Sequence, residues 1–278
     1  MTQKKSWMEW ITTLDRRIIF LLVAIAVVVP LVLKVALPVN ISPSVKPVYD
    51  YIEALPEGAR VMIALDYDPA SEAELYPMTL ALFRHCFDKK LRVLSWTQWP
   101  NGAALAERAF NTMKEEYNIQ PGVDFVNFGY QVGGAVVILQ AGQNLPVAFP
   151  TDYRGNPTAT MPIMQGLKTL NDLDYIIDLA AGATIDGWVA YGVQRYHFKM
   201  GAGCTAVSAT QYYPYLNAGQ INGLIGGLKG AAEYETLAGH PARAVAGMSA
   251  QSSVHALIII LVVLSNIFYF ALRKKGLR

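Results

Sequence analysis

The sequence carries little charge for its length. Only 16% of its 278 residues are Asp, Glu, Lys or Arg, whereas 53% are hydrophobic. Soluble globular domains carry about 25% charged residues. This shortage of charge predicts that part of the chain lies in lipid.

Motifs that identify common enzymes are also missing. The sequence has no Walker loop and no Gly-x-Ser-x-Gly nucleophile elbow, and no Gly-x-Gly-x-x-Gly turn follows the first predicted strand. The four histidines (His85, His197, His240 and His255) have no metal-ligand neighbours at useful spacing, and we place His85 and His197 at the surface or at helix ends. We expect no catalytic residue, metal or cofactor, and we favour a protein that is not an enzyme.

Cysteine is scarce too, with two residues, Cys86 and Cys204. An exported domain could join them in a disulfide. Because Cys86 falls on the apolar face of a predicted helix and Cys204 falls in a predicted strand, we favour two buried free thiols.

Two long apolar runs account for the surplus of hydrophobic residues. They occupy residues 18–39 and 254–272, and at 1.5 Å per helical residue each can cross most of a bilayer core of about 30 Å. Both are apolar all round, so we predict two transmembrane helices.

Basic residues flank these runs and set the orientation, because basic flanks stay in the cytoplasm. Residues 1–17 form a cytoplasmic segment in which Trp7 and Trp10 indicate an interfacial helix or, alternatively, a disordered tail; residues 273–278 form a cytoplasmic basic tail. The prediction is a two-pass protein of the cytoplasmic membrane, with its main domain periplasmic or extracellular. The basic flanking residues are Lys4, Lys5, Arg16, Arg17, Arg273, Lys274, Lys275 and Arg278.

The region between the two runs is mildly acidic. Nine of the 23 basic and two of the 21 acidic residues lie outside residues 41–253, which leaves 14 basic and 19 acidic residues within. This region offers no basic surface suited to nucleic acid.

Strand-like and helix-like segments alternate through this region. Such alternation predicts a parallel sheet with helical crossovers, here a five-stranded, doubly wound, flavodoxin-like or Rossmann-like α/β domain over residues 40–237, followed by a linker over residues 238–253. The predicted strands are 60–65, 91–96, 123–128, 174–180 and 204–209; the predicted helices are 71–87, 103–117, 134–142, 163–170, 184–197 and 216–237.

Ligands of doubly wound sheets bind beyond the carboxyl ends of the strands. The polar and aromatic residues expected there form a candidate site for a small molecule. They are Asp66, Asp68, Gln98, Trp99, Tyr130, Ser208 and Thr210.

The first strand ends in Asp66-x-Asp68, which resembles the first motif of haloacid-dehalogenase-like phosphatases. The resemblance covers about six residues, and Ala70 stands where that family usually has Thr or Val. It implies that Asp66 attacks phosphorus and Asp68 is the general acid, with Mg²⁺ neutralising the phosphate. The simpler interpretation, which we favour, is a helix start in which Ser71 caps the helix and Glu74 completes a capping box.

A glycine-rich stretch over residues 216–237 raises a different possibility. On a helix, Gly219, Gly223, Gly227 and Ala231 would form one flat stripe that lets another backbone approach closely. The partner of this stripe is either the same domain or a second subunit, and a third possibility is that the glycines form turns.

Taken together, these features favour a membrane-anchored structural or interaction subunit of a homo-oligomeric or larger envelope complex. The alternatives are a ligand-binding sensor or transport accessory that uses the strand-end pocket, and a metal-dependent phosphatase-like hydrolase that uses Asp66 and Asp68.

Overall fold

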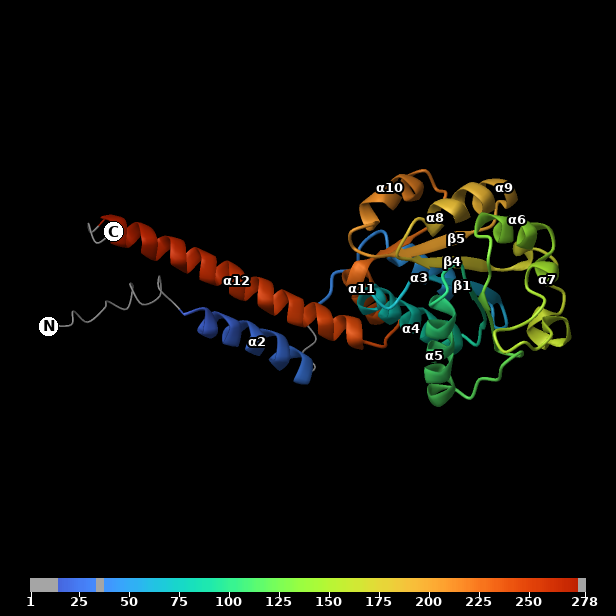
Figure 1. Ribbon diagram of the computed structural model, residues 1–278, viewed down its shortest axis with the longest axis horizontal. Helices are drawn as coiled ribbons and strands as arrows, with labels where there is room; N and C mark the ends of the chain where they lie inside the picture. Colours follow the sequence, from blue (N-terminus) through green and yellow to red (C-terminus); the bar gives the residue numbers. More distant parts are fainter. Residues whose placement is uncertain (1–14, 34–37, 275–278) are drawn as a thin grey trace. The chain divides into compact units, whose positions relative to one another are not determined.

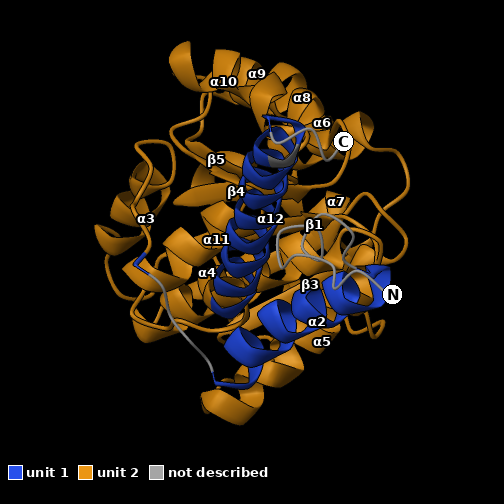
Figure 2. Cartoon of the chain, turned by 90° about the vertical axis from the view of Figure 1, so that its left-hand side faces the viewer, with its two compact units in different colours: residues 1–38, 246–278 blue, residues 39–245 orange. Residues whose placement is uncertain are grey.

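A computed structural model describes residues 15–33 and 38–274. The described residues divide into two compact units: residues 39–245 form the larger one, and those described before residue 39 and after residue 245 form the smaller one (Figure 2). The predicted interfacial helix with Trp7 and Trp10 lies outside the described residues.

The larger unit contains a six-stranded, fully parallel sheet in the order β3-β2-β1-β4-β5-β6. This is the strand order of Rossmann-like sheets, whereas flavodoxin-like sheets place their strands differently. The prediction of a doubly wound parallel sheet is confirmed, with one strand more than the five expected. The strands are β1 (Arg60–Asp66), β2 (Arg92–Thr97), β3 (Phe125–Tyr130), β4 (Tyr175–Ala180), β5 (Met200–Cys204) and β6 (Leu224–Gly226).

Helices cover both faces of this sheet (Figure 1). One face carries α3 (Lys46–Glu53), α4 (Glu72–Asp88), α5 (Gly102–Glu116) and α11 (Gly227–Leu237). The other carries α6 (Ala135–Gln143), α7 (Leu145–Ala148), α8 (Thr184–Gly187), the π-helix η4 (Trp188–Val193), α9 (Gln194–Tyr196) and α10 (Ala209–Asn217). The strands are buried on both faces, as near-continuous apolar segments such as Arg60–Asp66 predict.

Both edges of the sheet are covered by other parts of the chain. At β3 the Tyr153 amide donates to the Asn127 carbonyl over 2.7 Å, and at β6 the Leu224 amide donates to the Ser44 carbonyl over 2.8 Å. Covered edges prevent strand addition by a second chain.

Three predicted segments differ from the structure. The fifth strand is Met200–Cys204 instead of 204–209, because its glycines give room to large neighbours: a Cβ on Gly201 would lie 2.3 Å from the Tyr175 hydroxyl, and one on Gly203 would lie 2.4 Å from Leu179 Cδ2. The predicted helix at 163–170 is replaced by two 3₁₀ turns, η2 (Pro162–Met164) and η3 (Leu170–Asp172). A further turn, η1 (Thr158–Thr160), precedes them.

The glycine stripe is the third difference, because residues 216–237 do not form one helix. Gly219 lies in a turn at φ +69°, Gly223 precedes β6, and Gly227 begins α11 at φ +62°. A Cβ on Gly223 would lie 2.5 Å from Val48 Cγ2. The glycines therefore serve turns and close packing inside the domain, and the premise for an interface along Gly219, Gly223, Gly227 and Ala231 is removed.

The smaller unit contains the apolar helices. Within the described residues one helix is long and apolar enough to span a membrane, at Arg243–Ala271, where an 18-residue window has a mean hydropathy of 2.4; the sequence predicted two. It belongs to α12 (Arg243–Lys274), which takes in most of the range predicted as a linker. The described part of the first apolar run is α2 (Arg16–Val32), a helix of 17 residues.

Candidate functional site

The order of the strands reverses between β1 and β4, and this is where doubly wound sheets bind ligands. Asp66 is the last residue of β1 and pairs in register with Ala180, the last residue of β4. The Asp66 carbonyl accepts a hydrogen bond from the Ala181 amide over 3.0 Å. The ends of β1 and β4 are thus joined by a hydrogen bond at the point where the strand order reverses.

Asp66 has no solvent-exposed surface, and its carboxylate is held by the end of β2. Oδ1 accepts from the Gln98 amide at 2.6 Å and from Thr97 Oγ1 at 3.2 Å, while Oδ2 accepts from Gln98 Nε2 at 2.9 Å. Burial raises the pKa of Asp66 to about 6, although these hydrogen bonds act in the opposite direction.

A second carboxyl group, Asp178 of β4, lies next to Asp66. Asp178 pairs with Ala64, two residues before the Asp66–Ala180 pair, so both acids project from the same face of the sheet. Asp178 is fully buried, and no backbone or side-chain donor of the described residues reaches its oxygens with normal hydrogen-bond geometry; the polar groups that act on it are the Asp66 carboxyl and the Thr184 hydroxyl. Burial, and then the charge of Asp66, raise its pKa well above the usual range.

Aromatic side chains close the crevice above these acids. A Cβ on Gly182 would lie 2.9 Å from the Trp99 ring, and the Tyr212 hydroxyl donates to the Gly182 carbonyl over 2.8 Å. Asp66 is therefore present at the predicted place but is shielded from solvent in this structure.

The other predicted site residues do not gather around Asp66. Asp68 turns back on its own loop, where Oδ1 accepts from the Ala70 amide at 3.0 Å. Tyr130 is exposed at the end of the edge strand β3, and Ser208 bonds Thr205 beyond β5. Thr210 is exposed in the first turn of α10. Of the seven predicted residues, hydrogen bonds join only Asp66 and Gln98.

The predicted capping box at the start of α4 is wrong. The Ser71 side chain makes no capping hydrogen bond. Glu74 instead accepts from the Ala206 amide at 2.8 Å, so it ties α4 to the turn after β5. A longer-range contact has replaced the local one.

The hypothesis of a phosphatase-like nucleophile meets a geometric obstacle. A nucleophilic carboxylate must reach its substrate, yet Asp66 is fully buried and occupied by Gln98 and Thr97. The resemblance makes Asp68 the general acid, but the Asp68 carboxylate accepts a hydrogen bond from the Ala70 amide within its own turn.

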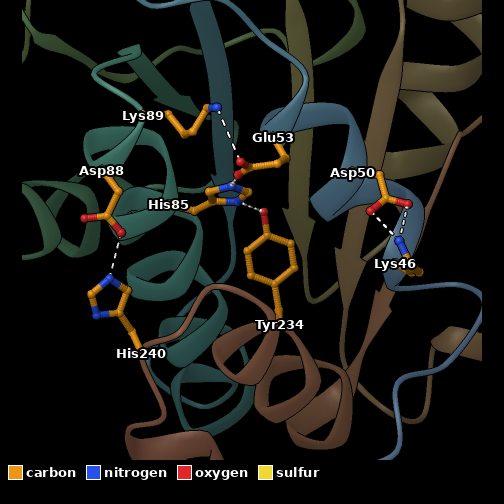
Figure 3. Close-up of polar contacts among 8 residues, drawn as sticks. All are labelled: Lys46, Asp50, Glu53, His85, Asp88, Lys89, Tyr234 and His240. Carbon is orange, nitrogen blue, oxygen red and sulfur yellow. Dashed lines mark hydrogen bonds and ion pairs between the residues drawn. The ribbon is translucent and has the colours of Figure 1, made fainter.

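A further buried titratable group lies on the opposite face of the sheet, where it joins three helices. His85 of α4, which the sequence placed at the surface or at a helix end, is buried between Tyr234 of α11 and Glu53 of α3 (Figure 3). Its Nδ1 lies 2.8 Å from the Tyr234 hydroxyl and its Nε2 lies 3.0 Å from Glu53 Oε2. Since a carboxylate only accepts, Nε2 carries the proton and Nδ1 accepts from Tyr234. Burial lowers the pKa of His85.

Both cysteines are buried free thiols, as predicted. Cys86 lies within α4 and Cys204 ends β5. Burial raises the pKa of the Cys204 thiol to about 12, so it is a poor nucleophile.

The fold and this site define a class: an α/β domain with Rossmann-like strand order, a closed carboxyl edge and a long apolar helix. Comparison with protein-family models, with curated proteins and with solved structures gives no match for the chain. Its function therefore has to be argued from its own residues.

Proposed function

We propose that this chain is a membrane-anchored α/β domain that acts as an interaction subunit of an envelope membrane complex. The observation that carries this proposal is the way the chain enters and leaves the domain. Both places are bound by one helix, α11, through two buried carboxylates, Glu233 and Glu235.

Glu233 holds the entering chain. Its Oε2 accepts from the Ser42 amide and its Oε1 from the Ser42 hydroxyl, each over 2.8 Å, and Lys229 pairs with the same carboxylate. Glu235 holds the leaving chain, where it accepts from the amides of Ala242, Ala244 and Val245 at 2.9–3.0 Å. These amides lie at the start of α12, where helical N–H groups lack partners within the helix.

The two carboxylates are two residues apart on α11, so the apolar segments before residue 39 and after residue 245 connect to neighbouring points of the domain. Neighbouring exits suit two segments that enter one bilayer from the same side. With basic flanks on both segments, this supports a two-pass anchor with both termini cytoplasmic and the domain outside.

The turns at the carboxyl edge of the sheet support an interaction role. The five turns that follow β1 to β5, at residues 67–71, 98–101, 131–134, 181–183 and 205–208, contain a single charged residue, Asp68. Val132 and Val207 in these turns are 80% and 84% exposed. Exposed apolar groups on an edge with so little charge favour a protein contact there. Self-association is one form of such contact, and it no longer depends on the glycine stripe.

Cysteine labelling tests the topology, because the two native thiols are buried and give little background. A membrane-impermeant maleimide should label Glu115→Cys, on the exposed face of α5, in intact spheroplasts. It should label Lys274→Cys, at the end of α12, only after permeabilisation. The reverse pattern would refute the proposed orientation.

Size measurement tests the interaction role. The full-length protein extracted in mild detergent should run above the size of a monomer in its micelle. Val132→Asp combined with Val207→Asp should reduce that size, whereas Asn118→Asp in an exposed turn at the amino edge should leave it unchanged. A wild-type protein that is monomeric both in detergent and after cross-linking in native membranes would refute an interaction subunit.

A further inference from the structure

Asp178 is an unusual residue for the middle of a buried strand. It lies in β4 with no exposed surface, and among the described residues the polar groups next to its carboxyl are the Asp66 carboxyl and the Thr184 hydroxyl, neither of which donates to it with normal hydrogen-bond geometry. Burying an ionised carboxylate without a partner is costly enough that such groups are normally paired or neutral.

The neighbours of Asp178 on its face of the sheet are small. Ala64 on β1 and Ala202 on β5 flank it in register, and Ala180 follows it on β4. These alanines contrast with the large residues that fill the rest of this face, such as Trp96, Phe128 and Met200.

Within residues 15–33 and 38–274, no basic group acts on this carboxyl. The titratable groups that interact with Asp178 are Asp66 from β1, Cys204 from β5 and Tyr212 from α10. All three are acids or neutral groups at physiological pH. The remaining polar neighbours, Thr184 of α8 and the indole of Trp188 in η4, carry no charge.

The helical layer on this face of the sheet includes an uncommon conformation, the π-helix η4 that follows α8. Trp188 opens the π-helix η4, and its ring meets that of Trp96 at 5.7 Å between centroids. Trp188 Nε1, Trp96 Nε1 and Thr184 Oγ1 are buried without a hydrogen-bond partner in the described part of the chain. π-helical turns are rare and occur frequently at functional sites.

Two adjacent carboxylates without a cation cannot both ionise at low cost. Asp66 accepts hydrogen bonds from Gln98 and Thr97 and is the better holder of a negative charge. We propose that Asp66 and Asp178 form a proton-binding site that keeps one proton on Asp178, and that loss of this proton loosens the η4 segment. The proton leaves to solvent water, no other bond changes, and the two negative charges that remain repel each other.

Infrared spectroscopy of the full-length protein in detergent tests where the proton resides. At pH 7 the wild type should show the C=O stretch of a buried protonated carboxylic acid. Asp178→Asn should abolish this band, while Asp174→Asn, an exposed acid just before the same strand, should retain it. Absence of the band from the wild type, or its survival in Asp178→Asn, overturns the proposal. So does a band that appears only after a chelator is added, because the pair would then hold a metal ion.

Hydrogen exchange followed by mass spectrometry tests whether loss of the proton loosens the η4 segment. The main measurement is made on the wild type. Between pH 7 and 9, exchange of the amides in residues 184–196 should rise by up to about tenfold per pH unit beyond the intrinsic pH dependence, as expected when opening follows loss of one proton. Residues 103–116 in α5 serve as the internal control and should show no excess. If residues 184–196 and 103–116 show the same pH dependence of exchange, the proposed link between the proton and the η4 segment is overturned. In Asp178→Asn neither segment should exchange faster than the intrinsic pH dependence predicts.

Discussion

Two pairs of buried acids lie in the same domain and differ in how they are satisfied. Glu233 and Glu235 on α11 each accept two or more hydrogen bonds from the segments that enter and leave the domain. Asp66 is bound as well, but Asp178 beside it is not. A buried carboxylate stabilises a fold when backbone donors surround it, and Asp178 has no such donors.

The largest expected effect comes from breaking the satisfied pair. Glu235→Ala leaves the amides of Ala242, Ala244 and Val245 without this acceptor, and we expect the free energy of unfolding of the larger unit to fall by about 3 kcal/mol. Urea unfolding of the full-length protein followed by circular dichroism measures it. Glu235→Gln, which keeps one acceptor oxygen, should lose less; equal losses would show that the charge, and not the hydrogen bonds, stabilises this end.

Replacing Asp178 is expected to raise the free energy of unfolding, whereas replacing Glu235 lowers it. The folded pKa of Asp178 is raised, so its contribution to stability is full below about pH 4 and is lost as the pH rises through the folded value. Asp178→Asn removes this cost and should raise the free energy of unfolding relative to the wild type, with a larger difference at pH 8 than at pH 5. A stability curve from pH 5 to 8 checks it, and a loss of stability throughout would contradict it.

A smaller effect of opposite pH dependence is expected from His85. Burial lowers its folded pKa, so the stability linked to the neutral imidazole is present above about pH 6.5 and is lost as the pH falls below it. The wild type should lose up to about 1 kcal/mol between pH 6.5 and 5.5 from this group. His85→Gln should flatten the curve in this window, whereas His197→Gln, at an exposed position, should not.

The smallest effect is expected from Ser42, whose hydroxyl and amide both donate hydrogen bonds to Glu233 where the chain enters the domain. Ser42→Ala removes the hydroxyl that donates to Glu233 but leaves the amide donor in place. We expect a loss of about 1 kcal/mol in the same urea experiment. An unchanged stability would mean that Lys229, which pairs with both partners, compensates fully.

Much of the fold could be predicted from the sequence, because periodic burial is a local signal. The strand at Arg60–Asp66 and the helix at Glu72–Asp88 follow the expected ranges to within a residue or two. Met200–Cys204 could not be recognised, since glycine weakens an isolated strand and is tolerated here only because Tyr175 and Leu179 fill the space above it.

The candidate site was predicted in part. Asp66 and Gln98 were expected near each other because parallel strands end at one edge, and they are hydrogen-bonded. Asp178 was missed, although a charged residue inside the apolar run YIIDLA is itself a signal, because buried acids are rare. His85 lies in the last turn of α4, as the helix-end alternative predicts, but its burial was not predicted because the helix pattern shows a face and not the helices that pack against it.

The sequence by itself determined the alternation of strands and helices, the parallel sheet and the long apolar segment at Arg243–Ala271, since each follows from residue periodicity and composition. Only the tertiary structure decided the strand order, the use of the glycines in turns and close contacts, and the meeting of Asp66 with Asp178. Those features depend on contacts between residues far apart in the chain, and the free energy of such contacts exists only once the layers have packed.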